Sequence, residues 1–241
     1  MSPPLPLRSL CWVTEDSPGA NRSTGKGATG TASRLSRLYL EALRAGDGPG
    51  AYRIASRGLR EGLAVPGLYQ RVIAPAMHEI GTLWARGALT VADEHQATEL
   101  TNRVLAALRP SPGIGGNLGG ASTAARSRAV LAAVEGERHA LGLRMAADIL
   151  EDNGFETIYL GADVPTDALL QAVAVTDSAL VVLAATMPTL TPRLEEVAGT
   201  VRQTHPRVEL LVGGQAASPR IAGGTLVESL ELLPERRLPR P

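Results

Sequence analysis

The sequence predicts two kinds of domain in one chain: a four-helix bundle followed by a doubly wound, flavodoxin-like parallel sheet, hence an α + α/β protein. Apolar residues recur at helical spacing from about residue 34 to residue 109. After residue 126, short and nearly continuous apolar runs alternate with helical segments, as expected for strands that are buried on both faces. At 241 residues the chain is long enough for each domain to bury its own core.

Composition sets the domain boundaries. Residues 1–33 contain too few apolar side chains to offset the entropy of ordering them, so we expect a disordered tail. A stretch rich in Gly, Ser and Pro predicts a flexible linker over residues 110–126. The helical bundle then covers residues 34–109, and the α/β domain covers residues 127–235.

Pro and Gly near "GDGPG", "VPG" and "ARGAL" divide the first domain into four helices. The third helix has the clearest apolar stripe and ends at Gly87, a typical C-cap; the stripe consists of Val72, Ile73, Ala76, Met77, Ile80, Leu83 and Trp84. Thr90 and Asp93 form a capping pair at the start of the fourth helix. We expect Glu94 and His95, which follow this cap, to point into the bundle.

The second domain contains four apolar runs, "AVLAAV", "FETIYLG", "ALVVLAA" and "VELLVGG", and a weak fifth strand near "TLVESLELL". In a doubly wound sheet, a ligand binds beyond the carboxyl ends of the strands, where the strand order reverses. The loops in which we expect functional residues are therefore 135–142, 184–188 and 213–217.

Charge and cysteine content narrow the function classes. Lys plus Arg and Asp plus Glu number 24 each, so no net charge attracts nucleic acid or an anionic membrane. The single cysteine, Cys11, supports neither a disulfide framework nor a thiolate metal cluster. The longest apolar run is too short to span a membrane, and no signal peptide is evident. We expect a cytoplasmic protein with no membrane partner and no direct nucleic-acid partner.

The loop "EGERHALG" carries the first candidate site. A loop His is usually solvated, but Glu137 can supply the carboxylate that fixes the tautomer of a metal-binding His139. Gly142 opens the following helix without a side chain. Gly213 and Gly214 end the fourth strand, where a bulky ligand could approach the backbone; a tight turn explains this pair equally well.

These residues resemble the signature of the cobalamin (B12)-binding domain: carboxylate, any residue, His, two residues, Gly, and a Gly-Gly pair about 70 residues later. The resemblance implies cobalamin as the cofactor, with His139 as the lower cobalt ligand and the nucleotide tail lying past the glycines. The helical region resembles the cap that precedes this domain in methionine synthase, corrinoid methyl carriers and cobalamin photoreceptors. The resemblance therefore implies a chromophore held between cap and α/β domain.

One position departs from the family pattern on this lower side. The family usually has a serine just after the third strand, bonded to the nucleotide tail, where this chain has Ala184. We expect the neighbouring Thr186 to make that contact instead.

Trp84, followed after nine residues by Glu94 and His95, resembles the upper-face motif of cobalamin photoreceptors, best known from light-sensing repressors of carotenoid genes. In those proteins the cap holds the adenosyl group of adenosylcobalamin, with Trp packed on it and Glu within bonding reach. The alternative is that Trp84 is bundle core and that Glu94 and His95 are a polar helix start.

A second departure concerns the light state. The repressors have a cobalt-binding His directly after the Trp, whereas this chain has Ala85, which cannot bind a metal. Either another donor such as His95 binds cobalt, or a different ligand lies above the corrin, such as the bilin (biliverdin) held by the photocobilin branch of the family. No helix-turn-helix module precedes the cap in this sequence, so we expect no direct DNA target.

Three functions agree with these motifs. The first is a cobalamin-dependent light sensor, not an enzyme, which signals by a change of conformation, oligomeric state or partner binding. The second is a corrinoid methyl-carrier protein of a methyltransferase system, which shares the cap and the His139 loop. The third is a mutase small subunit, which normally lacks the cap. Trp84, Glu94 and His95 favour the sensor, because a small methyl group would not need them.

Overall fold

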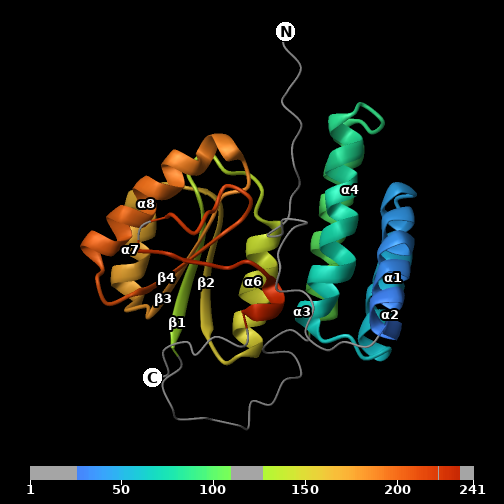
Figure 1. Cartoon of the computed structure of the whole chain (residues 1–241), viewed down its shortest axis with the longest axis horizontal. Helices are drawn as coiled ribbons and strands as arrows, with labels where there is room; N and C mark the ends of the chain where they lie inside the picture. Colours follow the sequence, from blue (N-terminus) through green and yellow to red (C-terminus); the bar gives the residue numbers. More distant parts are fainter. Residues whose placement is uncertain (1–25, 110–126, 222, 234–241) are drawn as a thin grey trace. The chain divides into compact units, whose positions relative to one another are not determined.

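The computed structural model describes residues 26–109, 127–221 and 223–233, which fall into a helical unit and an α/β unit (Figure 1). Most of the expected tail, the expected linker, Cys11 and the last two residues of the expected α/β domain lie outside the described residues. Within the described part, no helix is long and apolar enough to cross a membrane.

The helical unit is the expected four-helix bundle over residues 26–109. Its helices are α1 (Lys26–Arg44), α2 (Gly48–Arg60), a third helix made of α3 (Val65–Leu68), the π-helix η1 (Tyr69–Ile73) and α4 (Ala74–Ala85), and finally α5 (Val91–Leu108). The first helix begins at Lys26, not near residue 34, so the expected tail is too long. Ala32 is 2% exposed, and this packing, together with the low cost of extending an existing helix, accounts for the difference.

Pro75 explains the π-helix in the third helix. Proline has no N–H to donate, and its ring clashes with the carbonyl four residues earlier in a regular α-helix. The helical turn before Pro75 contains one extra residue, so that the amide of Ala74 donates to the carbonyl of Tyr69, five residues earlier. The helix therefore continues through the proline, and its apolar face stays in the bundle core.

The bundle core confirms most of the predicted stripe. Val72, Ile73, Ala76, Met77 and Ile80 are buried, whereas Leu83 and Trp84 near the end of α4 are half-buried. The core also contains a polar chain, in which the Tyr39 hydroxyl donates to Thr101 Oγ1 (3.3 Å) and the Thr101 hydroxyl donates to Met77 Sδ (3.2 Å). These directional bonds fix the register of α1, α4 and α5 against one another.

The α/β unit is a five-stranded parallel sheet in the order β2-β1-β3-β4-β5, the flavodoxin-like order that the apolar runs predict. In chain order its elements are β1 (Arg128–Val134), α6 (Leu141–Asp152), β2 (Glu156–Val164), α7 (Thr166–Thr176), β3 (Leu180–Ala184), η2 (Pro188–Leu190), α8 (Thr191–Thr204), β4 (Glu209–Gly213), β5 (Thr225–Leu226) and η3 (Leu230–Leu232). The weak fifth strand is present as the two residues of β5.

Helices cover both faces of this sheet, with α7 and α8 on one face and α6 on the other (Figure 1). Alternate residues of the central strands, such as Val130, Ala132 and Leu183, pack against the α7 and α8 side. The strand order reverses between β1 and β3, which are hydrogen-bonded neighbours up to the pair Ala133 and Ala184. The loops that follow β1 and β3 therefore leave the same edge of the sheet side by side.

Candidate functional site

A tight turn starts the loop between β1 and α6. The amide of Glu137 donates to the carbonyl of Val134 (2.9 Å), and Gly136 adopts the left-handed φ of 87° that this turn requires. The turn sends the Glu137 side chain into the protein, where it is 0% exposed, while the His139 side chain stays 29% exposed.

Glu137 accepts hydrogen bonds from two loops. Its Oε1 atom accepts from the backbone N–H of His139 (2.7 Å) and contacts His139 Nδ1 (2.6 Å). Its Oε2 atom accepts from the backbone N–H groups of Thr186 (2.5 Å) and Met187 (3.0 Å), which follow β3. One buried carboxylate thus joins the loop after β1 to the loop after β3, at the point where the strand order reverses.

These donors determine the protonation of the pair. Burial alone would raise the pKa of Glu137, but the hydrogen bonds from His139, Thr186 and Met187 outweigh it and hold the pKa of the carboxyl below its usual value. An ionised carboxylate only accepts hydrogen bonds, so His139 Nδ1 must be the donor. In the neutral imidazole, a proton on Nδ1 leaves the lone pair on Nε2, and this tautomer can bind a metal through Nε2.

The residues expected near the nucleotide tail lie along this same edge. Ala184 is the buried last residue of β3 and pairs with Gly213, the last residue of β4. Thr186 is half-buried, and its backbone amide holds Glu137. Its expected hydroxyl contact with a nucleotide tail stays a prediction. No sequence pattern points to Met187, because its contribution is a backbone amide that any residue type except proline would provide.

Close contact between two loops accounts for Gly214. This residue has a φ of 92°, and a Cβ atom there would lie 2.2 Å from the carbonyl oxygen of Ala185. The amide of Ala185 donates to the carbonyl of Gly213 (3.1 Å), so the backbones are tied together. The backbone conformation and this contact therefore require glycine at position 214, and the assignment of the Gly-Gly pair to a cofactor stays a prediction. Gly142 is the second residue of α6, as expected for a glycine that opens the helix.

The end of α4 and the start of α5 follow the predicted caps. Gly87 adopts a φ of 73° and its amide donates to the carbonyl of Trp84 (2.9 Å), which ends α4. Thr90 Oγ1 accepts from the amide of Asp93 (3.2 Å), and Asp93 Oδ2 accepts from the amide of Thr90 (2.8 Å), so the predicted capping pair is a complete capping box. Trp84 and Ala85 are half-buried in the last turn of α4.

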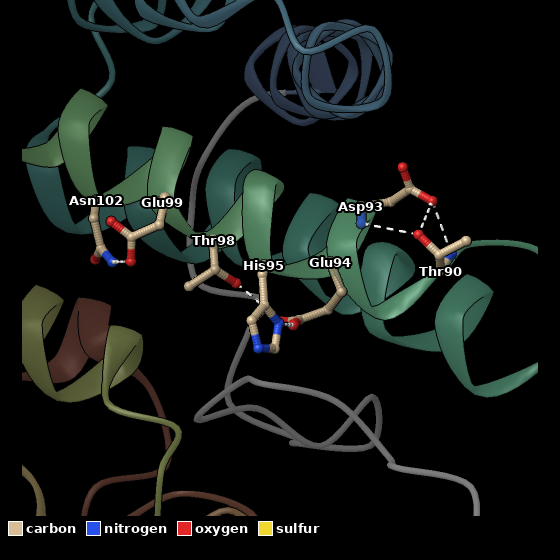
Figure 2. A network of polar contacts seen from close by, with 7 residues as sticks. All are labelled: Thr90, Asp93, Glu94, His95, Thr98, Glu99 and Asn102. Atoms are coloured by element: carbon tan, nitrogen blue, oxygen red, sulfur yellow. Dashed lines mark hydrogen bonds and ion pairs between the residues drawn. The ribbon is translucent and has the colours of Figure 1, made fainter.

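Glu94 and His95 form a pair on the first turn of α5 (Figure 2). Glu94 Oε2 lies 2.6 Å from His95 Nδ1, and Glu94 Oε1 accepts from the Thr98 hydroxyl (3.0 Å). The side chain of Glu94 is 17% exposed, but that of His95 is 74% exposed, so the expectation that His95 points into the bundle is wrong. The buried stripe of α5 runs through Ala97, and His95 lies about 100° around the helix from Glu94. Their assignment to a cofactor stays a prediction.

Comparisons with known proteins match both units. Residues 127–223 match a family described as B12 binding domain, and residues 35–109 match a second family model with the same description. The HTH-type transcriptional repressor CarH of Myxococcus xanthus is 29% identical over 201 residues, which are 82% of this chain and 63% of the relative. The chain thus spans less than two thirds of that repressor.

Corrinoid proteins are also similar. Dimethylamine corrinoid protein 1 of Methanosarcina acetivorans is 24% identical over 156 residues, which are 63% of this chain and 70% of the relative. Among solved structures, the monomethylamine corrinoid protein of Methanosarcina barkeri superposes with a TM-score of 0.67 at 17% identity, covering 84% of this chain and 96% of that protein. At this identity the superposition shows a shared fold.

Proposed function

The chain belongs to the B12-binding protein family, and from this premise we propose that it is a cobalamin-dependent light sensor in which His139 is the lower cobalt ligand. The observation that carries the lower-ligand assignment is the buried, ionised Glu137, whose Oε1 lies 2.6 Å from His139 Nδ1. In the neutral imidazole this contact selects the tautomer with the proton on Nδ1, which leaves Nε2 to bind the metal.

The residues of this edge fit the cofactor. His139 would bind cobalt, since imidazole is a good cobalt ligand. Glu137 orients the ring, and the amides of Thr186 and Met187 hold Glu137. We further assign Gly142, Ala184, Thr186, Gly213 and Gly214 to the cofactor-binding surface, with the Thr186 hydroxyl in place of the missing serine. Cobalamin, when bound, supplies the light absorption and the cobalt–carbon bond that light breaks.

The sensor assignment is supported by the helical unit. Trp84, Glu94 and His95 have the spacing of the photoreceptor motif, and the repressor CarH aligns over 82% of the chain. We assign these three residues to the upper side of the cofactor. The output is a change in conformation, oligomeric state or partner binding, because light removes interactions that exist in only one state.

Ala85 is the reason to include biliverdin in the proposal. A methyl side chain cannot replace the lost upper ligand after illumination, so another group must occupy that position. A bilin above the corrin would fill it and would extend the response to red light.

The corrinoid methyl carrier is the alternative function, because the dimethylamine corrinoid protein aligns over 63% of this chain. A carrier needs the lower ligand His139 but has no use for an adenosyl-contacting Trp84. The two functions therefore differ in whether Trp84 matters.

One experiment separates them. The protein is loaded with adenosylcobalamin in the dark, with and without biliverdin, and its absorption spectrum and hydrodynamic size are recorded before and after illumination. We expect a lasting spectral change together with a change in size or in backbone amide exchange of residues 84–95. Identical size and exchange in dark and light would refute the sensor and leave the carrier as the remaining proposal.

A further inference from the structure

The carboxyl end of β2 departs from a regular strand beside the His139 loop. Its register with β1 shifts twice, between the pairs Leu131–Tyr159 and Ala132–Gly161 and again before Val134–Val164. Within this irregular segment Asp163 has a φ of 54°, a left-handed conformation that is uncommon outside glycine and that Asp adopts when its side chain hydrogen-bonds nearby. Bulges and strained residues of this kind are typical of segments that aim a side chain or a neighbouring loop.

Asp163 holds the start of the loop at two consecutive residues. Its Oδ1 atom accepts a hydrogen bond from the amide of Gly136 (2.7 Å), and its own amide donates to the carbonyl of Glu137 (2.8 Å). With its left-handed backbone, residue 163 makes both bonds to the same turn, one through its side chain and one through its amide. The strained residue is thus the one that contacts the turn from which Glu137 enters the protein.

Tyr159 holds the end of the same loop. Its hydroxyl donates to the carbonyl of Ala140 (3.2 Å), the N-cap residue of α6, which also accepts from the amide of Arg144 (2.9 Å). The Arg144 guanidinium lies 5.7 Å from the centre of the Tyr159 ring. Burial raises the pKa of the Tyr159 hydroxyl, although the Arg144 charge partly lowers it, so the group remains a donor at neutral pH.

We propose that Asp163 and Tyr159 are positioning residues that fix the loop 135–140 at both ends and thereby pre-form the geometry in which His139 binds cobalt. The inference rests on the proposed role of His139. Between the two fixed points the loop carries Glu137 and His139, and any freedom at its ends must be removed when the cofactor binds. Both residues would then act on affinity and on His139 coordination without touching the metal.

Three variants and one control test the proposal. Asp163→Gly keeps the left-handed backbone but removes the acceptor, Asp163→Asn keeps an acceptor oxygen, and Tyr159→Phe removes only the hydroxyl. Asp177→Gly is the control, because Asp177 is also left-handed (φ 47°) but caps α7. Backbone amide exchange of residues 135–140 is measured in the cofactor-free protein. The cobalamin dissociation constant and the fraction with the base-off, His-on spectrum are then measured after loading.

We expect Asp163→Gly and Tyr159→Phe each to speed loop exchange and weaken cobalamin binding about 5-fold, the effect of one net hydrogen bond. Asp163→Asn should recover most of the loss, and Asp177→Gly should leave the loop unchanged. Unchanged loop exchange in both Asp163→Gly and Tyr159→Phe would overturn the proposal, as would faster exchange with unaltered affinity and spectrum. A normal His-on spectrum in His139→Ala would instead refute the lower-ligand assignment, while the exchange data would still report on the loop.

Discussion

Glu137 is a fully buried carboxylate, and an uncompensated buried charge is one of the most destabilising features a fold can contain. The chain compensates it with N–H donors from His139, Thr186 and Met187. A residue that only stabilised the fold could be apolar at this position. The buried charge is useful because it sets the tautomer of His139 and ties the two loops together.

The first prediction concerns His139 itself. Replacement by Ala removes the imidazole, so the loaded protein should lose the base-off, His-on absorption spectrum and bind corrinoid more weakly. The spectrum and a binding titration check this. His78→Ala is the matched control, since His78 is a half-buried His in the helical unit. A His-on spectrum that persists in His139→Ala would eliminate the assignment.

The second prediction follows from the pKa of Glu137, which is held below its ordinary value of 4.5. A depressed pKa contributes stability that is complete above the unfolded-state value and disappears as pH falls through the folded-state value. Glu137→Gln replaces one acceptor oxygen with an NH₂ group, which only donates and would face other N–H donors. The variant should therefore lower the free energy of unfolding by about 2 kcal/mol at pH 7.

This difference from wild type should begin to shrink as pH falls below 4.5, where the unfolded-state carboxyl takes up a proton, and should be lost once pH falls through the lower pKa of the folded-state carboxyl. Urea unfolding at a series of pH values measures it. Glu156→Gln is the control, since Glu156 forms an exposed pair with Arg128 and should change stability little. A loss in Glu137→Gln that is equally large at pH 3 would contradict the argument.

At the scale of elements, periodicity predicted the helices and strands well because each buried face repeats within a single element. The capping box at Thr90 and the C-cap at Gly87 were also predictable, since both are local interactions. The start of α1 and the π-helix before Pro75 were not, because they depend on packing against other helices and on how one turn rearranges.

The candidate site likewise contains residues that the sequence predicts and residues that it does not. Glu137 and His139 stand two residues apart, so the sequence revealed them. Met187, Asp163 and Tyr159 form hydrogen bonds with that loop although they lie 50, 27 and 19 residues from their partners in the sequence. No sequence motif includes them. The predicted orientation of His95 was wrong because one step along a helix turns the side chain by about 100°, from the inner side to the surface.

Gly214 gives a prediction about the junction of β3 and β4. In Gly214→Ala the new Cβ would meet the Ala185 carbonyl, and the residue would also be left-handed, so we expect a loss of about 3 kcal/mol. Gly154→Ala is a close control, because Gly154 has a φ of 90° but nothing within 4 Å of the added Cβ. That variant should lose only about 1 kcal/mol. Equal losses in urea unfolding would show that backbone strain alone governs both sites.

The end of α4 and the start of α5 carry the fourth prediction. Trp84→Ala and Glu94→Gln should each reduce retention of adenosylcobalamin and the response to light, because the first removes the aromatic surface, and the second removes the charge and one of the two acceptor oxygens, that we propose to lie on the upper side of the cofactor. The free energy of unfolding of each cofactor-free variant is measured beside them. If both variants kept wild-type retention and photoresponse, these residues would be only part of the bundle.

At the scale of the whole molecule, a light response needs two stable states that differ in their ligand contacts. Cobalt in the oxidised state left by photolysis and air favours a sixth ligand, for which imidazole is well suited. Residue 85 cannot supply it, and the ring of His95 is 74% exposed with Nδ1 2.6 Å from Glu94 Oε2. The wild-type light state should therefore contain no bis-imidazole cobalt, and water or a second chromophore should occupy the upper position.

The last prediction is that Ala85→His creates a locked light state that wild type lacks. Ala85 lies in the last turn of α4, directly after Trp84, so an imidazole there would stand beside the residue assigned to the upper side. After illumination of protein loaded with adenosylcobalamin, the variant should show a bis-His spectrum that persists in the dark, and wild type should not. The control is the double variant Ala85→His with His95→Ala, which should keep that spectrum. A bis-His spectrum already present in wild type and lost in His95→Ala would mean that His95 leaves Glu94 to bind cobalt. If it survived removal of both His95 and His78, the upper-side assignment would be wrong.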